Sequence, residues 1–211
     1  LRTRRAVEVR RALATLGPAI VLDELGLVDG GTGAAAATVE AAISRAVAAS
    51  GDRPLIVAPW RGDGHHDHRI AGEAAARAAV ATRTTLAEYP IWMWHWATPE
   101  TADIPWGTAV HVRLEDLDRA QKAAALAAYG SQIEPLSPAV GDEAIVDDRH
   151  LGHFSREAEV LFLTDEADAR PSSRTRASFD EFYERRPGGW DFSSWYERRK
   201  RAVLLSALPR E

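Results

Sequence analysis

The sequence predicts an α/β fold in which a mostly parallel β-sheet carries helices on both faces. Two observations favour this fold class. Short apolar runs alternate along the chain with longer, alanine-rich stretches whose apolar residues recur with the period of an α-helix. Strands that alternate with helices of this length are typical of βαβ units, in which the strands run parallel. With 211 residues, of which 45% are hydrophobic, the chain is long enough to bury one globular core.

The individual elements follow from these patterns and from the residues at their ends. Gly17 and Pro18 end the first amphipathic helix, and Thr32 is expected to cap the second helix. The expected helices cover residues 4–16, 30–50, 68–83 and 115–130. The expected strands cover residues 19–27, 54–60, 86–97, 108–114 and 157–163.

The last part of the chain differs in composition. Residues 164–177 are polar, charged and rich in turn-forming residues, which is typical of a linker. Residues 178–211 are aromatic and helical in pattern, but they are too few to form a core of their own. We therefore expect one main domain at residues 1–163, a linker, and a C-terminal helical extension.

Composition excludes several classes of site and partner. Because the chain has no cysteine, it contains neither a disulfide, nor a thiolate metal site, nor a cysteine nucleophile. The formal net charge of -5 argues against nucleic-acid binding, which needs a basic surface. No apolar run approaches the roughly 20 residues that span a bilayer, and residues 1–11 lack the apolar core of a secretory signal. A cytoplasmic protein without a membrane span is expected.

A cluster of histidines and aspartates lies between the expected strand at 54–60 and the helix that follows it. In a parallel sheet, ligands bind at the carboxyl ends of the strands, and this loop occupies that position. If the helix begins near His66, the rings of His65 and His68 lie on one face and can converge on one point. Asp63 or Asp67 could then orient an imidazole by accepting its second N–H. A helix amino end would also favour an anionic ligand.

Two interpretations of this cluster stay open from spacing alone. One is a metal or catalytic site. The other is a solvated loop, because His, Asp and Gly are common in turns. The acidic run DELGLVD, residues 23–29, is interpreted as a solvated loop.

The stretch APWRGDGHHDHRIAGEAAARAA, residues 58–79, resembles the second motif of the PIG-L/LmbE-like family of zinc-dependent de-N-acetylases. That motif is His-Pro-Asp-His in most members, and His66 here replaces the proline. Further similar segments are the Arg5-x-x-Glu8 helix with its terminal Leu-Gly, LAEYPIWMWHW, and KAAALAAYGSQ at residues 122–132. The resemblance covers residues 1–163 and implies a Rossmann-like, LmbE-like fold.

The resemblance also implies chemistry at named residues. His68 would be a zinc ligand, His65 would stabilise the tetrahedral oxyanion and protonate the leaving amine, and Asp67 would be the carboxylate beside it. The implied reaction is hydrolysis of an N-acetyl group on an amino sugar, such as N-acetylglucosamine, or on a glycoconjugate. The implied cofactor is Zn²⁺, although another divalent metal also suits His and Asp ligands.

The sequence departs from this family at its first motif, Ala-His-Pro-Asp-Asp-Glu. Nothing in residues 1–211 matches that motif, which supplies the other metal ligands and the general base. One protein ligand alone does not hold zinc tightly. We expect that the motif precedes the sequence shown; the alternative is a degenerate, non-catalytic member of the family.

Other candidate substrate-binding residues are Asp63, His95, Trp96 and Gln132. Trp92, Trp94 and Trp96 alternate along the strand expected at 86–97 and should share one face, mainly for packing. Trp96 and His95 are the exceptions because they approach the carboxyl end of that strand. Gln132 either reaches the pocket, as the family resemblance suggests, or caps a helix.

The extension at residues 178–211 resembles the leading segment of class I S-adenosylmethionine-dependent methyltransferases of the nodulation type. The segment stops before any cofactor-binding motif, so it implies no methyl transfer by these residues. A covalently linked methyltransferase domain is the partner that this resemblance suggests. A helical extension packed on the main domain is the alternative.

Overall fold

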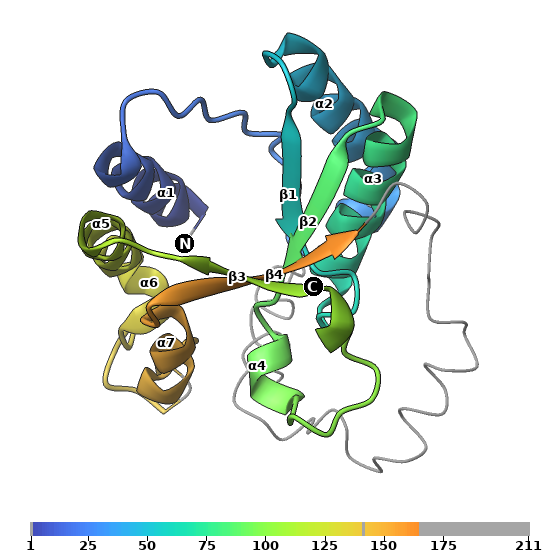
Figure 1. The fold of residues 1–211 in the computed structure, drawn as a ribbon. Helices are drawn as coiled ribbons and strands as arrows, with labels where there is room; N and C mark the ends of the chain where they lie inside the picture. The colour runs from blue at the N-terminus through green and yellow to red at the C-terminus, as the bar shows by residue number, and fades with distance from the viewer. Residues whose placement is uncertain (1, 141, 165–211) are drawn as a thin grey trace, which may run out of the picture. The chain divides into compact units, whose positions relative to one another are not determined.

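The computed structural model describes residues 2–140 and 142–164, which form two compact units (Figure 1). Unit 1 takes in residues 2–21 and 118–151, and unit 2 takes in Leu22–Leu117 and residues 152–164. The expected extension at 178–211, and the expected linker beyond its first residue, lie outside the described residues.

The described elements are mixed α and β. The α-helices are α1 Arg2–Leu16, α2 Ala36–Ala49, α3 His66–Thr82, α4 Met93–Trp96, α5 Asp116–Ala127, α6 Gly130–Ile133 and α7 Asp148–Phe154. The strands are β1 Leu55–Pro59, β2 Thr85–Tyr89, β3 Ala109–Arg113 and β4 Ala158–Thr164, with 3₁₀ helices at η1 Thr32–Ala35 and η2 Trp106–Thr108. The four long expected helices and the strands expected at 54–60, 108–114 and 157–163 are thus confirmed.

The four strands form one mixed sheet in the order β1-β2-β4-β3. Only β1 and β2 pair in parallel, with Leu55 opposite Thr85, whereas β4 is antiparallel to both β2 and β3. The expectation of a mostly parallel sheet is therefore wrong for the described strands, and an α/β class with a mixed sheet is what the structure has.

The reversal of β4 follows from the path of the chain after β3. The amide of Leu114, just beyond β3, donates to the carbonyl of Glu157, just before β4, at 2.8 Å. The long excursion through α5, α6 and α7 therefore begins and ends at the same end of the sheet, so the returning strand must run antiparallel to β3. Alternation of strands and helices along a sequence does not reveal such a return.

Two expected strands are also corrected. Residues 19–27 contain no strand. The strand expected at 86–97 ends at Tyr89, because Pro90 has no N–H to donate to a neighbouring strand and the following residues turn into the short helix α4. The alternation of the tryptophans is therefore not the alternation of a strand.

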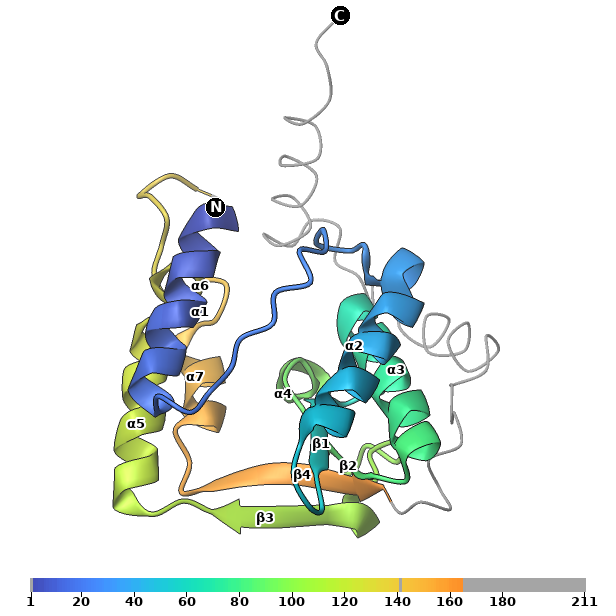
Figure 2. The same ribbon diagram turned by 90° about the horizontal axis from the view of Figure 1, so that it is seen from above.

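In unit 2, α3 packs on β1 and β2, and α2 packs on α3 (Figure 2). The shared core consists of small and aliphatic side chains: Ile56, Ala58, Ala75, Ala76, Ala78, Ala79 and Leu86. The close approach extends to Gly72, where a Cβ atom would lie 2.5 Å from the carbonyl oxygen of Pro59. The alanine-rich sequence of α3 thus lets the helix lie close to the end of β1 that precedes the histidine loop. On the opposite face of β1, Leu55 and Val57 are half exposed.

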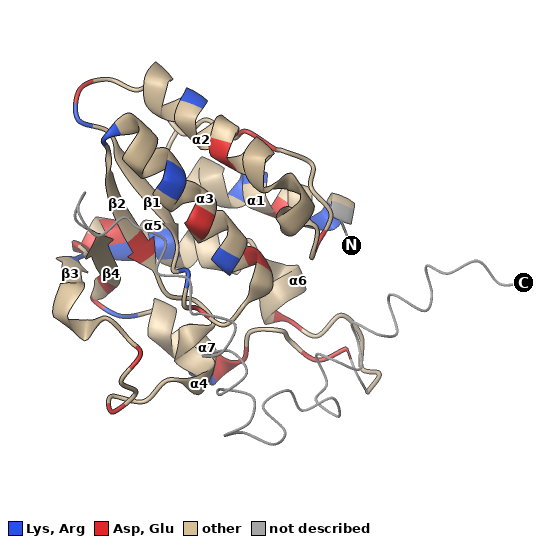
Figure 3. Ribbon diagram, turned by 90° about the vertical axis from the view of Figure 1, so that its right-hand side faces the viewer, with Lys and Arg blue, Asp and Glu red and all other residues tan. Residues whose placement is uncertain are grey.

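Acidic and basic residues occur along both α2 and α3, as the red and blue segments of the ribbon show (Figure 3). Arg77 Nε lies 2.7 Å from Glu40 Oε2 and joins the two helices. Both side chains are at least one-third exposed, so this ion pair contributes little to stability. Among the described residues, no helix is long and apolar enough to cross a membrane.

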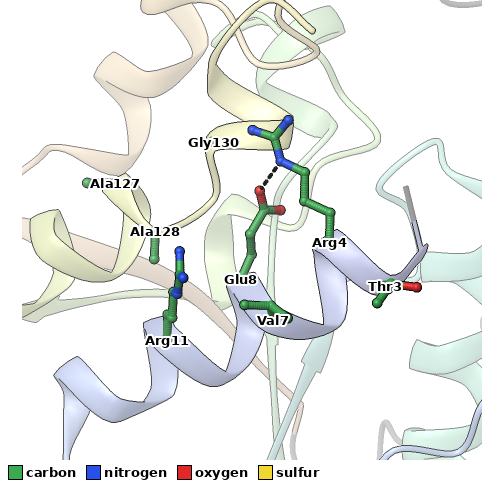
Figure 4. A pocket seen from close by; sticks show the side chains of 8 residues that line it. All are labelled: Thr3, Arg4, Val7, Glu8, Arg11, Ala127, Ala128 and Gly130. Atoms are coloured by element: carbon green, nitrogen blue, oxygen red, sulfur yellow. Dashed lines mark hydrogen bonds and ion pairs between the residues drawn. The ribbon is translucent and has the colours of Figure 1, made fainter.

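Unit 1 is organised around a buried carboxylate on α1. Glu8 is 4% exposed, and its carboxylate accepts hydrogen bonds from the amide and hydroxyl of Ser131 at 2.8 and 2.5 Å. Arg4 Nε donates to the same carboxylate at 3.0 Å, beside a pocket that lies between α1 and the end of α5 (Figure 4). These hydrogen bonds outweigh the effect of burial, which alone would raise the pKa, so the pKa of Glu8 is lowered. The Arg-x-x-Glu helix and the Ser-Gln segment noted in the sequence are therefore joined through Glu8 and Ser131.

Candidate functional site

The histidine loop lies directly after β1, as predicted, and α3 begins within it at His66. His65 is the residue that precedes the helix, and its ring caps it: Nδ1 accepts a hydrogen bond from the amide of Asp67 at 3.2 Å. His65 and His68 lie on the same side of the first turn, with ring centroids 4.5 Å apart. The two rings thus lie close together at the start of α3, as the spacing predicted.

Asp63 is the centre of the loop. Its side chain is fully buried, and its carboxylate accepts hydrogen bonds from the amides of Ile91, Trp92 and Met93 at 2.8–2.9 Å. His68 Nδ1 lies 2.5 Å from the Oδ2 atom of the same carboxylate. The buried carboxylate of Asp63 thus orients the His68 imidazole, the role that the sequence suggested for Asp63 or Asp67.

The contact with Asp63 fixes the tautomer of His68. Because the carboxylate only accepts, Nδ1 of His68 donates, and in the neutral form of the ring Nε2 is left with a lone pair. The side chain of His68 is 20% exposed. This is the arrangement in which a metal-binding histidine is held by a carboxylate behind it.

His65 has the opposite arrangement. Its Nδ1 accepts from the Asp67 amide, so the neutral ring carries its proton on Nε2. Burial lowers the pKa of His65 and the neighbouring His68 lowers it further, although nearby carboxylates act in the other direction. His65 is therefore neutral at pH 7 and offers an N–H rather than a positive charge.

The side chain of Asp67 does not contact the His65 ring through any hydrogen bond in the structure. Its two oxygens instead accept from the amide of Gly30 at 2.8 Å and from the hydroxyl of Thr32 at 2.6 Å. Burial raises the pKa of Asp67, but these two hydrogen bonds outweigh it and the pKa is lowered. The hydroxyl of Thr32 therefore binds Asp67. The expectation that Thr32 caps the following helix is wrong.

Asp29 is a residue near the site that the sequence did not single out. It adjoins Gly30, whose amide donates to Asp67. Its negative charge acts to raise the pKa of His65, against the larger lowering effect of burial. The sequence DELGLVD does not predict that Asp29 lies near His65. Its turn is brought to α3 by the contact between Gly30 and Asp67, which are far apart in the sequence.

The aromatic residues after β2 separate into different environments. Trp96 donates from Nε1 to the carbonyl of Asp63 at 3.1 Å and stacks on Trp60. The indole also packs closely on the backbone of the loop at Gly64, which has φ +86°. A Cβ atom on Gly64 would lie 3.0 Å from Trp96 Nε1. His95 is exposed and packs against Trp92, whose ring in turn stacks on His65. His95 is thus linked through Trp92 to the histidine pair, whereas Trp96 contacts Asp63 and Trp60.

Gln132 lies in unit 1, in α6. With its amide oriented to satisfy both ends, its side-chain oxygen accepts from Nε and Nη2 of Arg5 at 2.8 and 3.1 Å. Its backbone carbonyl accepts from the amides of Ile145 and Val146 at 2.9 Å. Within unit 1, Gln132 therefore joins α1 to the segment before α7.

The residues that could hold a metal form an incomplete set. His68 presents one suitable nitrogen, but no group of three or more His, Cys, Asp or Glu side chains among residues 2–140 and 142–164 is arranged to bind a metal ion. A structural or catalytic zinc site needs at least three protein ligands. The described residues alone therefore do not fit a complete metal site.

Comparison of the chain with known proteins gave no matching family model, no matching curated protein and no matching solved structure. The resemblance to de-N-acetylases thus depends on the motifs themselves, and the geometry of the loop is the evidence that bears on chemistry.

Proposed function

We propose that the protein hydrolyses the N-acetyl group of an N-acetylated amino sugar or glycoconjugate with the help of a divalent metal, most simply Zn²⁺. The observation that carries the proposal is the pairing of two histidines with opposite tautomers at the start of α3. His68 is held by the buried Asp63 carboxylate and has an Nε2 lone pair. His65, with its ring centroid 4.5 Å away, offers an N–H.

In this proposal the two rings have different tasks. The Nε2–H of His65 donates a hydrogen bond to the acetyl oxygen as negative charge develops on it, which is the role of an oxyanion donor. The lowered pKa of His65 and the Asp67 amide that donates to its Nδ1 both favour the neutral ring. A neutral ring can donate a hydrogen bond to the oxyanion but is a weaker acid than an imidazolium. His68 contributes one ligand nitrogen, and Asp63 holds its ring in position.

The metal itself would supply an activated water and polarise the acetyl carbonyl when bound. The proposal requires further ligands that the described residues do not provide.

The experiment that tests the proposal is measurement of acetate released from N-acetylglucosamine, with the protein treated with a chelator and then resupplied with Zn²⁺, Co²⁺ or Mn²⁺. Release that depends on added metal and is lost in His65→Ala supports the proposal. Equal rates with and without metal, or an active His65→Ala protein, would contradict it.

A second candidate function is favoured by one specific observation, the absence of a three-ligand group among the described residues. In this alternative the fold is a non-catalytic module that serves a covalently linked S-adenosylmethionine-dependent methyltransferase. Metal-dependent acetate release from any N-acetylated amino sugar would exclude this alternative, and its absence under all metals would favour it.

A further inference from the structure

Four aromatic rings form a row in unit 2, from the start of α3 to α4. The ring centroids of His68 and His65 are 4.5 Å apart, those of His65 and Trp92 are 5.8 Å apart, and those of Trp92 and His95 are 4.6 Å apart. Trp92 is partly exposed and His95 is exposed, whereas Met93 between them is fully buried. The row therefore continues the histidine pair outward along the surface of α4.

The position of Trp92 is set by the same atom that orients His68. Oδ2 of Asp63 accepts both from His68 Nδ1 at 2.5 Å and from the amide of Trp92 at 2.9 Å. The backbone of Trp92 is therefore held beside the histidine pair by the buried carboxylate.

We propose that Trp92 and His95 form the subsite for the sugar ring of the substrate, next to His65. This inference rests on the proposed function and adds the residues that would recognise the ring. One face of a pyranose ring presents C–H groups, which pack on aromatic surface, here the part of the Trp92 indole that stays exposed beside His65 and His95, and the polar imidazole of His95 can bind a neighbouring hydroxyl. Binding sites of this kind combine aromatic surface with a few polar groups.

The neighbouring tryptophans are engaged elsewhere and provide controls. Trp96 donates to the Asp63 carbonyl and stacks on Trp60, so it belongs to the support of the loop. Trp94 stacks on His153 with ring centroids 4.8 Å apart, and the guanidinium of Arg156 lies 4.9 Å from its ring centroid. Trp94, in the short helix that Trp92 precedes, is therefore a control for Trp92.

The test is a titration of the full chain with N-acetylglucosamine, followed through the indole N–H signals in ¹H–¹⁵N NMR spectra. Tryptophan-to-phenylalanine variants assign the signals. We expect the Trp92 signal to shift and the Trp94 signal to stay in place. Trp92→Ala and His95→Ala should each weaken sugar binding by about three- to tenfold, while Trp94→Phe leaves it unchanged.

His95 is exposed, so His95→Ala keeps the test valid if Trp92→Ala fails to fold. The subsite is overturned if N-acetylglucosamine does not bind, if binding leaves the Trp92 signal in place, or if the Trp92 and Trp94 variants bind it equally. Failure of the proposed function is a different result: the sugar shifts the Trp92 signal, but no acetate is released with any metal.

Discussion

Nδ1 of His68 lies 2.5 Å from Oδ2 of Asp63, a carboxylate that is fully buried and also accepts from three consecutive backbone amides. A single carboxylate thus fixes both a histidine on α3 and the chain that leads into α4. Asp63→Asn keeps the shape but places an NH₂ group where acceptors are needed. We expect the free energy of unfolding to fall by about 3–5 kcal/mol, as when one partner of a buried charged network is removed.

Chemical denaturation of the Asp63→Asn variant measures this loss. Asp52→Asn, at an exposed position, is the control and should leave the free energy of unfolding unchanged. A variant as stable as the parent protein would show that the amides of residues 91–93 do not depend on Asp63.

His68 and His65 should differ in their effect on metal binding. If His68 is a ligand, His68→Ala removes the only nitrogen that Asp63 holds for a metal, and the zinc content should fall below that of the parent protein. His65→Ala should hold as much zinc as the parent protein, because Nε2 of His65 carries a proton and does not coordinate, but most deacetylation should disappear. Metal content after gel filtration and acetate release are the two measurements. A zinc-replete and active His68→Ala protein would contradict the assignment.

Gly72 and Gly152 both lie in helices, but replacing each with alanine should change the stability of the protein in opposite directions. At Gly72, a Cβ atom would lie 2.5 Å from the carbonyl oxygen of Pro59 and 2.7 Å from Cγ of Arg61, so Gly72→Ala should cost roughly 1–3 kcal/mol of stability. At Gly152, a Cβ atom would meet nothing within 4 Å, so Gly152→Ala should stabilise by about 0.5–1 kcal/mol. Thermal unfolding of both variants checks the pair, and a stabilising Gly72→Ala would refute the close approach of α3 to β1.

The sequence predicted the histidine loop well because its signals are local. A buried strand, a loop of Gly, His and Asp, and an alanine-rich helix follow one another within residues 54–83, and hydrophobic periodicity places each of them. The start of α3 at His66 then brings His65 and His68 together, since residues three apart share a helix face.

What the sequence did not predict depends on contacts between distant residues. The turn into α4 is held by Asp63, about thirty residues earlier, so the Trp-x-Trp-x-Trp pattern was misinterpreted as a strand. Asp67 binds Gly30 and Thr32, and so brings Asp29 near His65, across a similar separation. Local periodicity carries no information on such pairs, nor on the direction in which β4 returns to the sheet.

Because the pKa of Glu8 is lowered in the folded protein, the free energy of unfolding should decrease at acidic pH. In the folded protein this pKa lies below its ordinary value of 4.5, because hydrogen bonds from Ser131 and Arg4 outweigh the opposing effect of burial. The unfolded state therefore binds a proton more readily than the folded state. The stabilisation from Glu8 is fully present above pH 4.5 and is lost as the pH falls through the lower, folded value.

Glu8→Gln should remove this contribution, because the amide has no charge and only one oxygen to accept hydrogen bonds. At pH 7 we expect its free energy of unfolding to be lower than that of the parent protein by about 1.5–3 kcal/mol. As the pH falls below 4.5, the difference between the two proteins should narrow, because Glu8 itself becomes protonated. Urea denaturation from pH 7 to pH 3 measures the difference, with the exposed Glu100→Gln as a control that should follow the parent protein throughout. A gap between parent and Glu8→Gln that stays constant over this range would mean that the ionised carboxylate of Glu8 is not what joins α1 to Ser131.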